Sequence, residues 1–390
     1  MSFRKDFVLR AKQRGVNFTD LCETFGISRK TGYTWVRRFK DGGVQGLENM
    51  DRGPRPRKPL DGTPEMAHDI RDIRGAHPTW GSKKIRAVLL RKYVDNPEVV
   101  PSARSIDRHL RYCGLTKPRR PRRRKASPGK RPEVVVNGPN DLWTVDFKGW
   151  WMTLGGHKAE PLTIRDDHSK MVLAVHLVSS PSIEQVKAVF EDLFQRYGVP
   201  KVIQSDNGPP FAYNGPGLGL TRLSAWWLAL GIRWVRSRPG KPQDNGAHER
   251  MHRTMKAEIQ SHPTWTLGQQ QDACDVWRHE FNHHRPHQSL KDETPASVYR
   301  RSSRVYPGAP LEPVYSEGWL RRKVSKCGQL RCLGEQHHVS NALAGYTVGV
   351  ELLEGARFRL WFGAICLGVG TLPWNGDLRP PGPDVQTLQT

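Results

Sequence analysis

The spacing of apolar residues divides the chain into three kinds of region. Near the N-terminus apolar positions recur every three or four residues. Phe3, Phe7 and Ala11 give the first helix of this kind, and Gly15 ends it. From about residue 138 the apolar residues form short runs typical of strands, with helical stretches between them. After Pro307 short strand-like runs alternate with glycine turns. The pattern predicts a helical, a mixed α/β and an all-β region in that order.

The stretch FTDLCETFGISRKTGYTWVRRFKDGG predicts two short helices. We expect Thr19 or Asp20 to cap the first, Gly26 to make the turn, and Ser28 to cap the second. An apolar stripe on the second helix leaves its other faces polar or basic, with Arg29, Lys30, Tyr33, Thr34, Arg37 and Arg38. This layout is typical of a helix-turn-helix, whose second helix enters the major groove of DNA. A plain helical hairpin with a solvated basic face would show the same pattern.

The first helix-turn-helix is expected within residues 1–50, and a second, weaker one within residues 60–116, where Ser102 caps the last helix. A basic linker over residues 117–136 follows. Its run KPRRPRRRKASPGKRP contains nine basic residues, no acidic residue and several prolines, so it cannot form a core of its own. We expect this linker to lie along DNA phosphates, with these arginines in contact: Arg122, Arg123 and Arg124.

The charge balance indicates the class of partner. Lys and Arg number 62 against 38 Asp and Glu, which gives a formal net charge of +24. Such an excess is typical of proteins that bind a polyanion. No apolar run approaches the roughly 18 residues of a spanning helix, and the first residues lack the apolar core of a signal peptide. The six cysteines are scattered, as in a reducing compartment. We therefore expect a cytoplasmic protein that binds nucleic acid and no membrane.

Residues 137–302 are predicted to form a mixed sheet with helices on its faces. Three strand-like runs make an antiparallel meander: LWTVDFKGWWM, PLTIRDDHS and MVLAVHLVSS. A helix, the strand KVIQSD, a short buried helix, an edge strand and two longer helices, over about 244–260 and 267–284, follow. Residues 305–372 are predicted to form a small β-barrel, and residues 373–390 a disordered tail.

Three carboxylates mark a candidate metal site in the mixed sheet. Asp146 lies mid-strand between Val145 and Phe147, where an unpaired carboxylate is costly. Asp206 ends the fourth strand, and adjacent parallel strands would bring it close to Asp146. Glu249 lies on a helix flank open to the sheet edge. Three carboxylates favour Mg²⁺ or Mn²⁺ over zinc. Two such ions can activate a nucleophile and stabilise the leaving oxygen of a phosphodiester. Spacing alone fits unrelated surface acids equally well.

Four motifs in this order resemble a known family: WTVDFKG, SDNGPPF, RPGKPQDNGAHERMHRTMKAE and FNHHRPHQSL. They are similar to the integrase core of insertion-sequence transposases, the DDE group that shares a ribonuclease H-like fold with retroviral integrases. With the helix-turn-helix units and VSNALAGYTVGV, nearly the whole chain resembles the 481 group. The resemblance implies that the catalytic triad is Asp146, Asp206 and Glu249, with two Mg²⁺ (or Mn²⁺) ions per site. It also implies an SH3-like or integrase C-terminal DNA-binding barrel.

One segment departs from the family pattern. The stretch between Asp206 and Glu249 is longer than usual, and the excess fits the Gly- and Pro-rich run AYNGPGLGLT, a loop insertion that leaves the flanking motifs intact.

The resemblance implies a transposase that binds the ends of a mobile element and catalyses metal-dependent strand cleavage and strand transfer. Its partners would be double-stranded DNA, both terminal inverted repeats and target, and further copies of itself, in a nucleoid-associated bacterial assembly. Further DNA contacts are expected around the last catalytic helix, from Lys241, Asn245, His252, Arg253 and Lys256. The alternative is a sequence-specific DNA-binding regulator with an inert or domesticated core.

Overall fold

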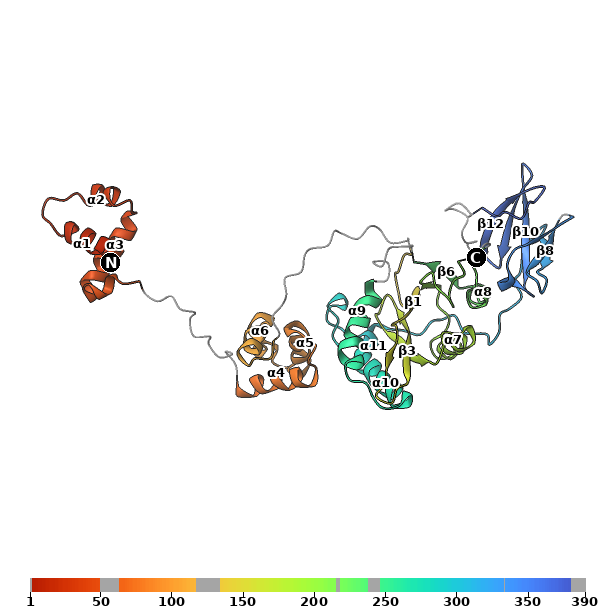
Figure 1. Cartoon of the computed structure of the whole chain (residues 1–390), viewed down its shortest axis with the longest axis horizontal. Coiled ribbons are helices and arrows are strands. Elements are labelled where there is room, and N and C mark those ends of the chain that lie inside the picture. The colour runs from red at the N-terminus through yellow and green to blue at the C-terminus, as the bar shows by residue number, and fades with distance from the viewer. Residues whose placement is uncertain are drawn as a thin grey trace. The chain divides into compact units, whose positions relative to one another are not determined.

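The computed structural model describes residues 2–49, 63–116, 134–214, 218–237, 246–332 and 334–379 (Figure 1). The chain divides into two compact units, Met1–Asp61 and Gly62–Thr390. The elements follow the predicted order, first helical, then mixed α/β, then antiparallel β, which confirms the fold class. In the described part of the chain, no helix has the length and apolar character needed to cross a membrane.

The first unit is a small helical domain around an aromatic core. Its helices are α1 (Ser2–Ala11), α2 (Phe18–Thr24), α3 (Arg29–Gly42) and the 3-10 turn η1 (Gln45–Leu47). The ring of Phe7 packs edge-on against Phe18, Phe25 and Trp35, with centroids 5.3–5.9 Å apart. These four rings hold the three helices together at the predicted turn.

The capping predictions for this unit were half right. Ser28 caps α3, because its hydroxyl accepts a hydrogen bond from the N–H of Thr31 at 3.2 Å. The prediction that Thr19 or Asp20 caps α2 was wrong. The helix begins earlier, with Phe18, whose ring joins the core, and the side chain of Asn17 accepts from the N–H of Thr19 at 2.9 Å. Asn, Asp and Thr all suit a capping position, so residue type alone did not distinguish Asn17 from Thr19 and Asp20.

The second unit begins with a second helical group. It contains α4 (Pro64–Ala76), α5 (Ser82–Lys92), the 3-10 turn η2 (Pro97–Val99) and α6 (Ala103–Tyr112). Ser102 caps α6 as predicted, because its hydroxyl accepts from the N–H of Ser105 at 3.2 Å. Fully buried Ile70, Ile85 and Ile106 supply one apolar side chain from each helix. Three short amphipathic helices are thereby packed face to face.

A six-stranded mixed sheet follows. Its strands are β1 (Leu142–Phe147), β2 (Trp151–Met152), β3 (Lys158–Asp166), β4 (Val172–Val178), β5 (Val202–Ser205) and β6 (Arg233–Arg236). They run in the order β2-β3-β1-β5-β6, and β4 pairs with β3. β1, β3 and β4 form the predicted antiparallel meander, whereas β1, β5 and β6 are parallel.

Helices cover both faces of this sheet (Figure 1). They are α7 (Ile183–Tyr197), α8 (Arg222–Ala229), α9 (Gly246–Met255) with its π-helical continuation η4 (Lys256–Gln260), α10 (Leu267–His283), the 3-10 turn η5 (Gln288–Leu290) and α11 (Pro295–Val298). Strand residues Val145 and Ile164 pack in the cluster with α7 and α8. Val175 packs in the cluster with α9 and α10. Side chains alternate along a strand, so Asp146 and Thr163 face the α9 side.

Antiparallel strands form the C-terminal region. They are β7 (Leu320–Lys323), β8 (Gln329–Cys332), β9 (Glu335–His338), β10 (Thr347–Leu353), β11 (Arg357–Phe362) and β12 (Ile365–Thr371), with the 3-10 turn η6 (Asn341–Leu343). Four of them make one sheet, β12-β11-β10-β7, and β8 and β9 make a hairpin. Their shared core also contains Leu220 and Leu228.

The predicted tail over 373–390 needs a correction at its start. Trp374 is 3% exposed and packs against Phe358 in the core of the C-terminal strands. Arg379 forms a backbone bridge to Val369. Residues 373–379 are therefore ordered, because one buried tryptophan anchors a segment whose Pro and Gly content suggested disorder. The rest of the tail lies outside the described residues.

Candidate catalytic site

The register of two parallel strands places Asp146 and Asp206 at the same level of the sheet. β1 pairs with β5 so that Leu142 lies opposite Val202 and Thr144 lies opposite Gln204. Continuing this register by two residues brings Asp146 beside Asp206. The two carboxylates are thus neighbours across adjacent strands, although a meander and a helix separate them along the chain.

The pKa of Asp146 indicates that the carboxylates of Asp206 and Glu249 are close enough to act on it. Burial first, then the negative charges of Asp206 and Glu249, together raise the pKa of Asp146 to about 7, against a lowering hydrogen bond from the Phe147 backbone. A shift toward neutrality by like charges is the signature of carboxylates that share a site. Such shifts cluster at functional sites.

Asp206 is held by the turn that follows β5. Its carboxylate accepts a hydrogen bond from the N–H of Gly208 at 3.3 Å, an Asx-type turn. Next to it, the side-chain amide of Asn207 donates to the carbonyl of Ser237 at 2.5 Å, which ties the turn to the end of β6. Burial raises the pKa of Asp206, and the Gly208 hydrogen bond lowers it. The turn therefore fixes the direction of this carboxylate.

Glu249 approaches from the other side, on the first turn of α9, and is exposed. Met251, Met255 and Ile259 hold this helix and its continuation on the sheet. Among the described residues, the one group of three His, Cys, Asp or Glu side chains with ligand atoms mutually within 4.8 Å is an exposed cluster on α4. The carboxylate oxygens of Asp146, Asp206 and Glu249 are therefore not all within 4.8 Å of one another.

Between Glu249 and Asp146 lies a hydrogen-bonded chain that the sequence did not indicate. The Nε2 of His252 is 2.8 Å from the hydroxyl of Thr163, and that hydroxyl donates to the carbonyl of Asp146 at 2.8 Å. Thr163 is fully buried and lies directly opposite Asp146 in the β1–β3 pairing. No signal in the sequence identified Thr163, because its place beside Asp146 depends on the pairing of β3 with β1.

The predicted DNA contacts on α9 divide into two groups. Arg253 and Lys256 are exposed and available to DNA. His252 is instead engaged with Thr163, and burial, with the nearby Lys148 and Arg165, lowers its pKa to about 3. A neutral, half-buried imidazole is a poor phosphate ligand, so the structure gives His252 a different environment from the one expected. Lys241 and Asn245 lie outside the described residues.

The residues predicted to read DNA on α3 form one accessible face. Arg29, Lys30 and Arg37 are exposed, and Tyr33 is 54% exposed with its ring stacked on Phe18 at 4.3 Å. Thr34 and Arg38 are half-buried. The helix therefore presents its basic side chains outward while its apolar stripe packs inward. The linker arginines Arg122, Arg123 and Arg124 lie outside the described residues.

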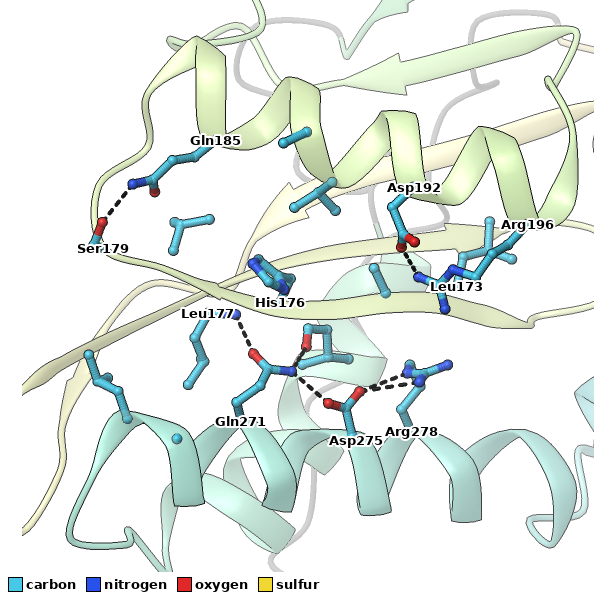
Figure 2. Close-up of a pocket in the computed structure, with 17 residues that line it drawn as sticks. Leu173, His176, Leu177, Ser179, Gln185, Asp192, Arg196, Gln271, Asp275 and Arg278 are labelled. Carbon is cyan, nitrogen blue, oxygen red and sulfur yellow. Dashed lines mark hydrogen bonds and ion pairs between the residues drawn. The ribbon is translucent and has the colours of Figure 1, made fainter. Parts of the chain in front are cut away.

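A cavity of about 970 Å³ lies elsewhere, along the edge strand β4 between α7 and α10 (Figure 2). The amide of Gln271 accepts from the N–H of Leu177 at 2.8 Å and donates to the carbonyl of Val175 at 2.9 Å. These bonds satisfy the open edge of β4 from within the chain. No member of the carboxylate set lines this cavity, so its size does not mark the catalytic site.

Comparisons with known proteins agree with this architecture. Two family models of the integrase core domain match residues 136–242 and 230–295. Two homeodomain-like models match residues 4–48 and 31–110.

Two insertion-element proteins are similar over most of their lengths. One, from insertion element IS407 of Burkholderia multivorans, is 25% identical over 63% of this chain and 82% of its own. The other, from IS476 of Xanthomonas euvesicatoria, is 24% identical over 65% of this chain and 71% of its own. Among solved structures, the HTLV-2 integrase catalytic core domain in complex with magnesium is similar at 16% identity and a TM-score of 0.33, covering 42% of this chain and 98% of that one. The chain therefore has an integrase core preceded by homeodomain-like domains, an architecture consistent with an insertion-element transposase.

Proposed function

We propose that Asp146, Asp206 and Glu249 are the catalytic triad of this transposase. The observation that carries the proposal is that Asp206 and Glu249 both act on the carboxylate of Asp146, whose pKa is raised to about 7 by burial and by their two negative charges. Two of them come from adjacent parallel strands and the third from the helix packed over that end of the sheet. Carboxylates brought together at such a cost are typical of a metal-dependent site.

The donor set fits a hard divalent cation. All three side chains offer carboxylate oxygens, the ligands that Mg²⁺ and Mn²⁺ prefer, and a cation would offset the repulsion that raises the pKa of Asp146. We propose that these residues hold two such ions, which when bound activate the attacking oxygen and stabilise the leaving oxygen of the phosphodiester.

The reaction we propose has two phosphoryl-transfer steps at this one site. Hydrolysis at the end of the element frees a 3′-hydroxyl, and that hydroxyl then attacks a phosphodiester of target DNA in line with its leaving group. The exposed Arg253 and Lys256, close along the chain to Glu249, are suited to hold DNA phosphates during both steps. The outward face of α3 reads the terminal inverted repeat. An element has two ends and each chain has one triad, so we expect two or more copies to act together.

A strand-transfer assay tests this proposal. Purified full-length protein, labelled DNA carrying an end of the element, and unlabelled target DNA are combined with Mg²⁺, Mn²⁺ or EDTA. We expect labelled target with either metal and none with EDTA. A sequence-specific regulator with an inert core, the alternative, would bind the end DNA in all conditions and yield no cleaved or joined product. Cleavage of any duplex without preference for element ends would favour a general nuclease instead.

A further inference from the structure

The helix that carries Glu249 is tied to the strand that carries Asp146 by a short polar chain. His252 lies one helical turn beyond Glu249, and residues three apart share a helix face. From that face its Nε2 reaches the hydroxyl of Thr163 at 2.8 Å, and the same hydroxyl reaches the carbonyl of Asp146 at 2.8 Å. Two hydrogen bonds thus connect the backbone of one carboxylate residue to the helix of another.

The number of available protons determines which group donates in each of these two hydrogen bonds. A threonine hydroxyl has one proton, and here it is donated to the Asp146 carbonyl. The bond between Thr163 and His252 must therefore be donated by the imidazole, which places the ring proton on Nε2. Valine at position 163 would keep the shape and lose both bonds. A serine would keep both.

The surroundings hold the pair rigidly. Thr163 is completely buried in the central part of β3, opposite Asp146. His248 is completely buried next to His252, with ring centroids 5.4 Å apart, and the Thr163 backbone lies beside it. A buried hydrogen-bonded group has few alternative positions, so it transmits the placement of α9 to β1.

We propose that His252 and Thr163 are positioning residues that set the separation of Glu249 from Asp146 for metal binding. This inference rests on the proposed function, since it assumes that the carboxylates hold a divalent cation. Neither residue touches the reacting atoms. Each acts through the geometry of the carboxylates, in the way that partners of metal ligands orient those ligands elsewhere.

Mn²⁺ binding to the full-length protein, followed by the electron paramagnetic resonance of the free ion, measures this role without the reaction. All variants, the reference included, carry Asp72→Asn, which removes a member of the exposed α4 group of His68, Asp69 and Asp72 as a competing site. In that background, Thr163→Val is expected to weaken Mn²⁺ binding by about tenfold or more, and Thr163→Ser by about twofold at most. His252→Gln, whose amide can donate in place of Nε2, should keep most of the affinity that His252→Phe loses.

The matched control is Thr254→Val, on the same helix, whose hydroxyl bonds only the carbonyl of Arg250 at 3.2 Å in the described structure. It should bind Mn²⁺ as the reference does. Circular dichroism checks the fold of each variant. If Thr163→Val does not fold, the comparison of His252→Gln with His252→Phe decides.

The Mn²⁺ measurement distinguishes failure of the positioning role from failure of the proposed triad. If Asp206→Asn and Glu249→Gln lose Mn²⁺ while folded Thr163→Val and His252→Phe bind it as the reference does, the positioning role is overturned and the triad stands. If Asp206→Asn and Glu249→Gln also bind Mn²⁺ unchanged, the proposed triad itself fails. Selective loss in Thr163→Val, with recovery in Thr163→Ser, supports the inference.

Discussion

The helix α3, which we propose reads DNA, and the carboxylate site are built over different ranges of the chain. α3 takes all its outward side chains from one helix, Arg29–Gly42, whose inner stripe packs on its immediate neighbours. The carboxylate site takes Asp146, Asp206 and Glu249 from two strands and a helix, and the pairing of the strands determines whether they meet. The exposed residues of a single helix can be substituted without disturbing its fold. A site formed by strand register depends on the pairing of both strands, so one of its residues cannot be relocated without the others.

The comparison predicts the largest effect at the carboxylates. Glu249→Gln removes one charge and keeps the shape, and strand transfer should fall by about a thousandfold or more, because residues that act as a unit fail together. The readout is the rate of labelled product at saturating end DNA. Affinity for the DNA should remain, since α3 is untouched.

Glu184→Gln is the matched control for this change. Glu184 is exposed and lies in the first turn of α7, just as Glu249 lies in the first turn of α9. It should transfer strands at the wild-type rate. A Glu249→Gln protein that also keeps that rate would remove Glu249 from the triad.

A second prediction concerns the basic face of α3. The triple variant Arg29→Ala, Lys30→Ala and Arg37→Ala should reduce the preference for end DNA over random DNA by at least about tenfold, since one good base contact is worth about 1–3 kcal/mol. Competition binding measures the ratio. Lys40→Ala, in the last turn of the same helix, should leave it unchanged because the N-terminal part of a recognition helix contacts the bases.

If the preference survives the triple change, another region reads the sequence. The helix α6, which Ser102 caps, is the next candidate. The contrast in how α3 and the carboxylate site are built would remain, but α3 would not be the element that reads the DNA sequence.

These two regions also differ in how far the sequence predicted them. The periods of Phe3, Phe7 and Ala11 and the capping signal of Ser28 are local, so the helical unit and its exposed face followed from the sequence. At α2 the local signal was ambiguous, because Asn17, Thr19 and Asp20 are all residues that can cap a helix.

At the candidate catalytic site, the motifs indicated three carboxylates, but strand pairing is not local and no spacing predicts it. Thr163 could not be found for this reason, because its importance comes only from lying opposite Asp146. The same holds for Trp374, whose burial depends on strands far along the chain. Contacts made by register or by distant packing are decided by the whole fold.

A third prediction uses the pKa of Asp146. Because this pKa is raised to about 7, a proton competes with the metal below that pH, and Mg²⁺ affinity should fall by about tenfold for each pH unit below 7. Without metal, the free energy of unfolding changes with pH in the opposite direction to the Mg²⁺ affinity. The neutral carboxyl stabilises the fold below its unfolded pKa, and this contribution is lost as pH rises through about 7.

Thermal unfolding between pH 5 and pH 8 (roughly two units below and one above that pKa) checks both signs. The midpoint of the metal-free protein should carry a component that falls with pH, and Mg²⁺ should raise the midpoint most at the alkaline end. Asp146→Asn should abolish that component. A wild-type protein whose Mg²⁺ affinity is flat across this range would exclude Asp146 as the titrating ligand.

The smallest effect on strand transfer is expected where the long segment between Asp206 and Glu249 meets the C-terminal strands. This segment closes on itself, with Ala212 bridged to Leu220 and the N–H of Tyr213 donating to the carbonyl of Gly219 at 3.0 Å. Leu220 and Leu228 then pack in the core of the C-terminal strands. The added residues therefore dock a neighbouring module and leave the turn at Asp206 intact.

Leu228→Ala tests this docking. Leu228 is 5% exposed, so truncation should destabilise the protein by about 2–5 kcal/mol, the usual range for a buried leucine. Leu154→Ala is the control, because Leu154 is 56% exposed and loses little burial. Hydrogen exchange should increase both in α8 and in η6 across the contact, since each buries the other's apolar side chains. Faster exchange in α8 alone would show that the C-terminal strands hold their position without this contact, and the packing of Leu228 would then have no docking role.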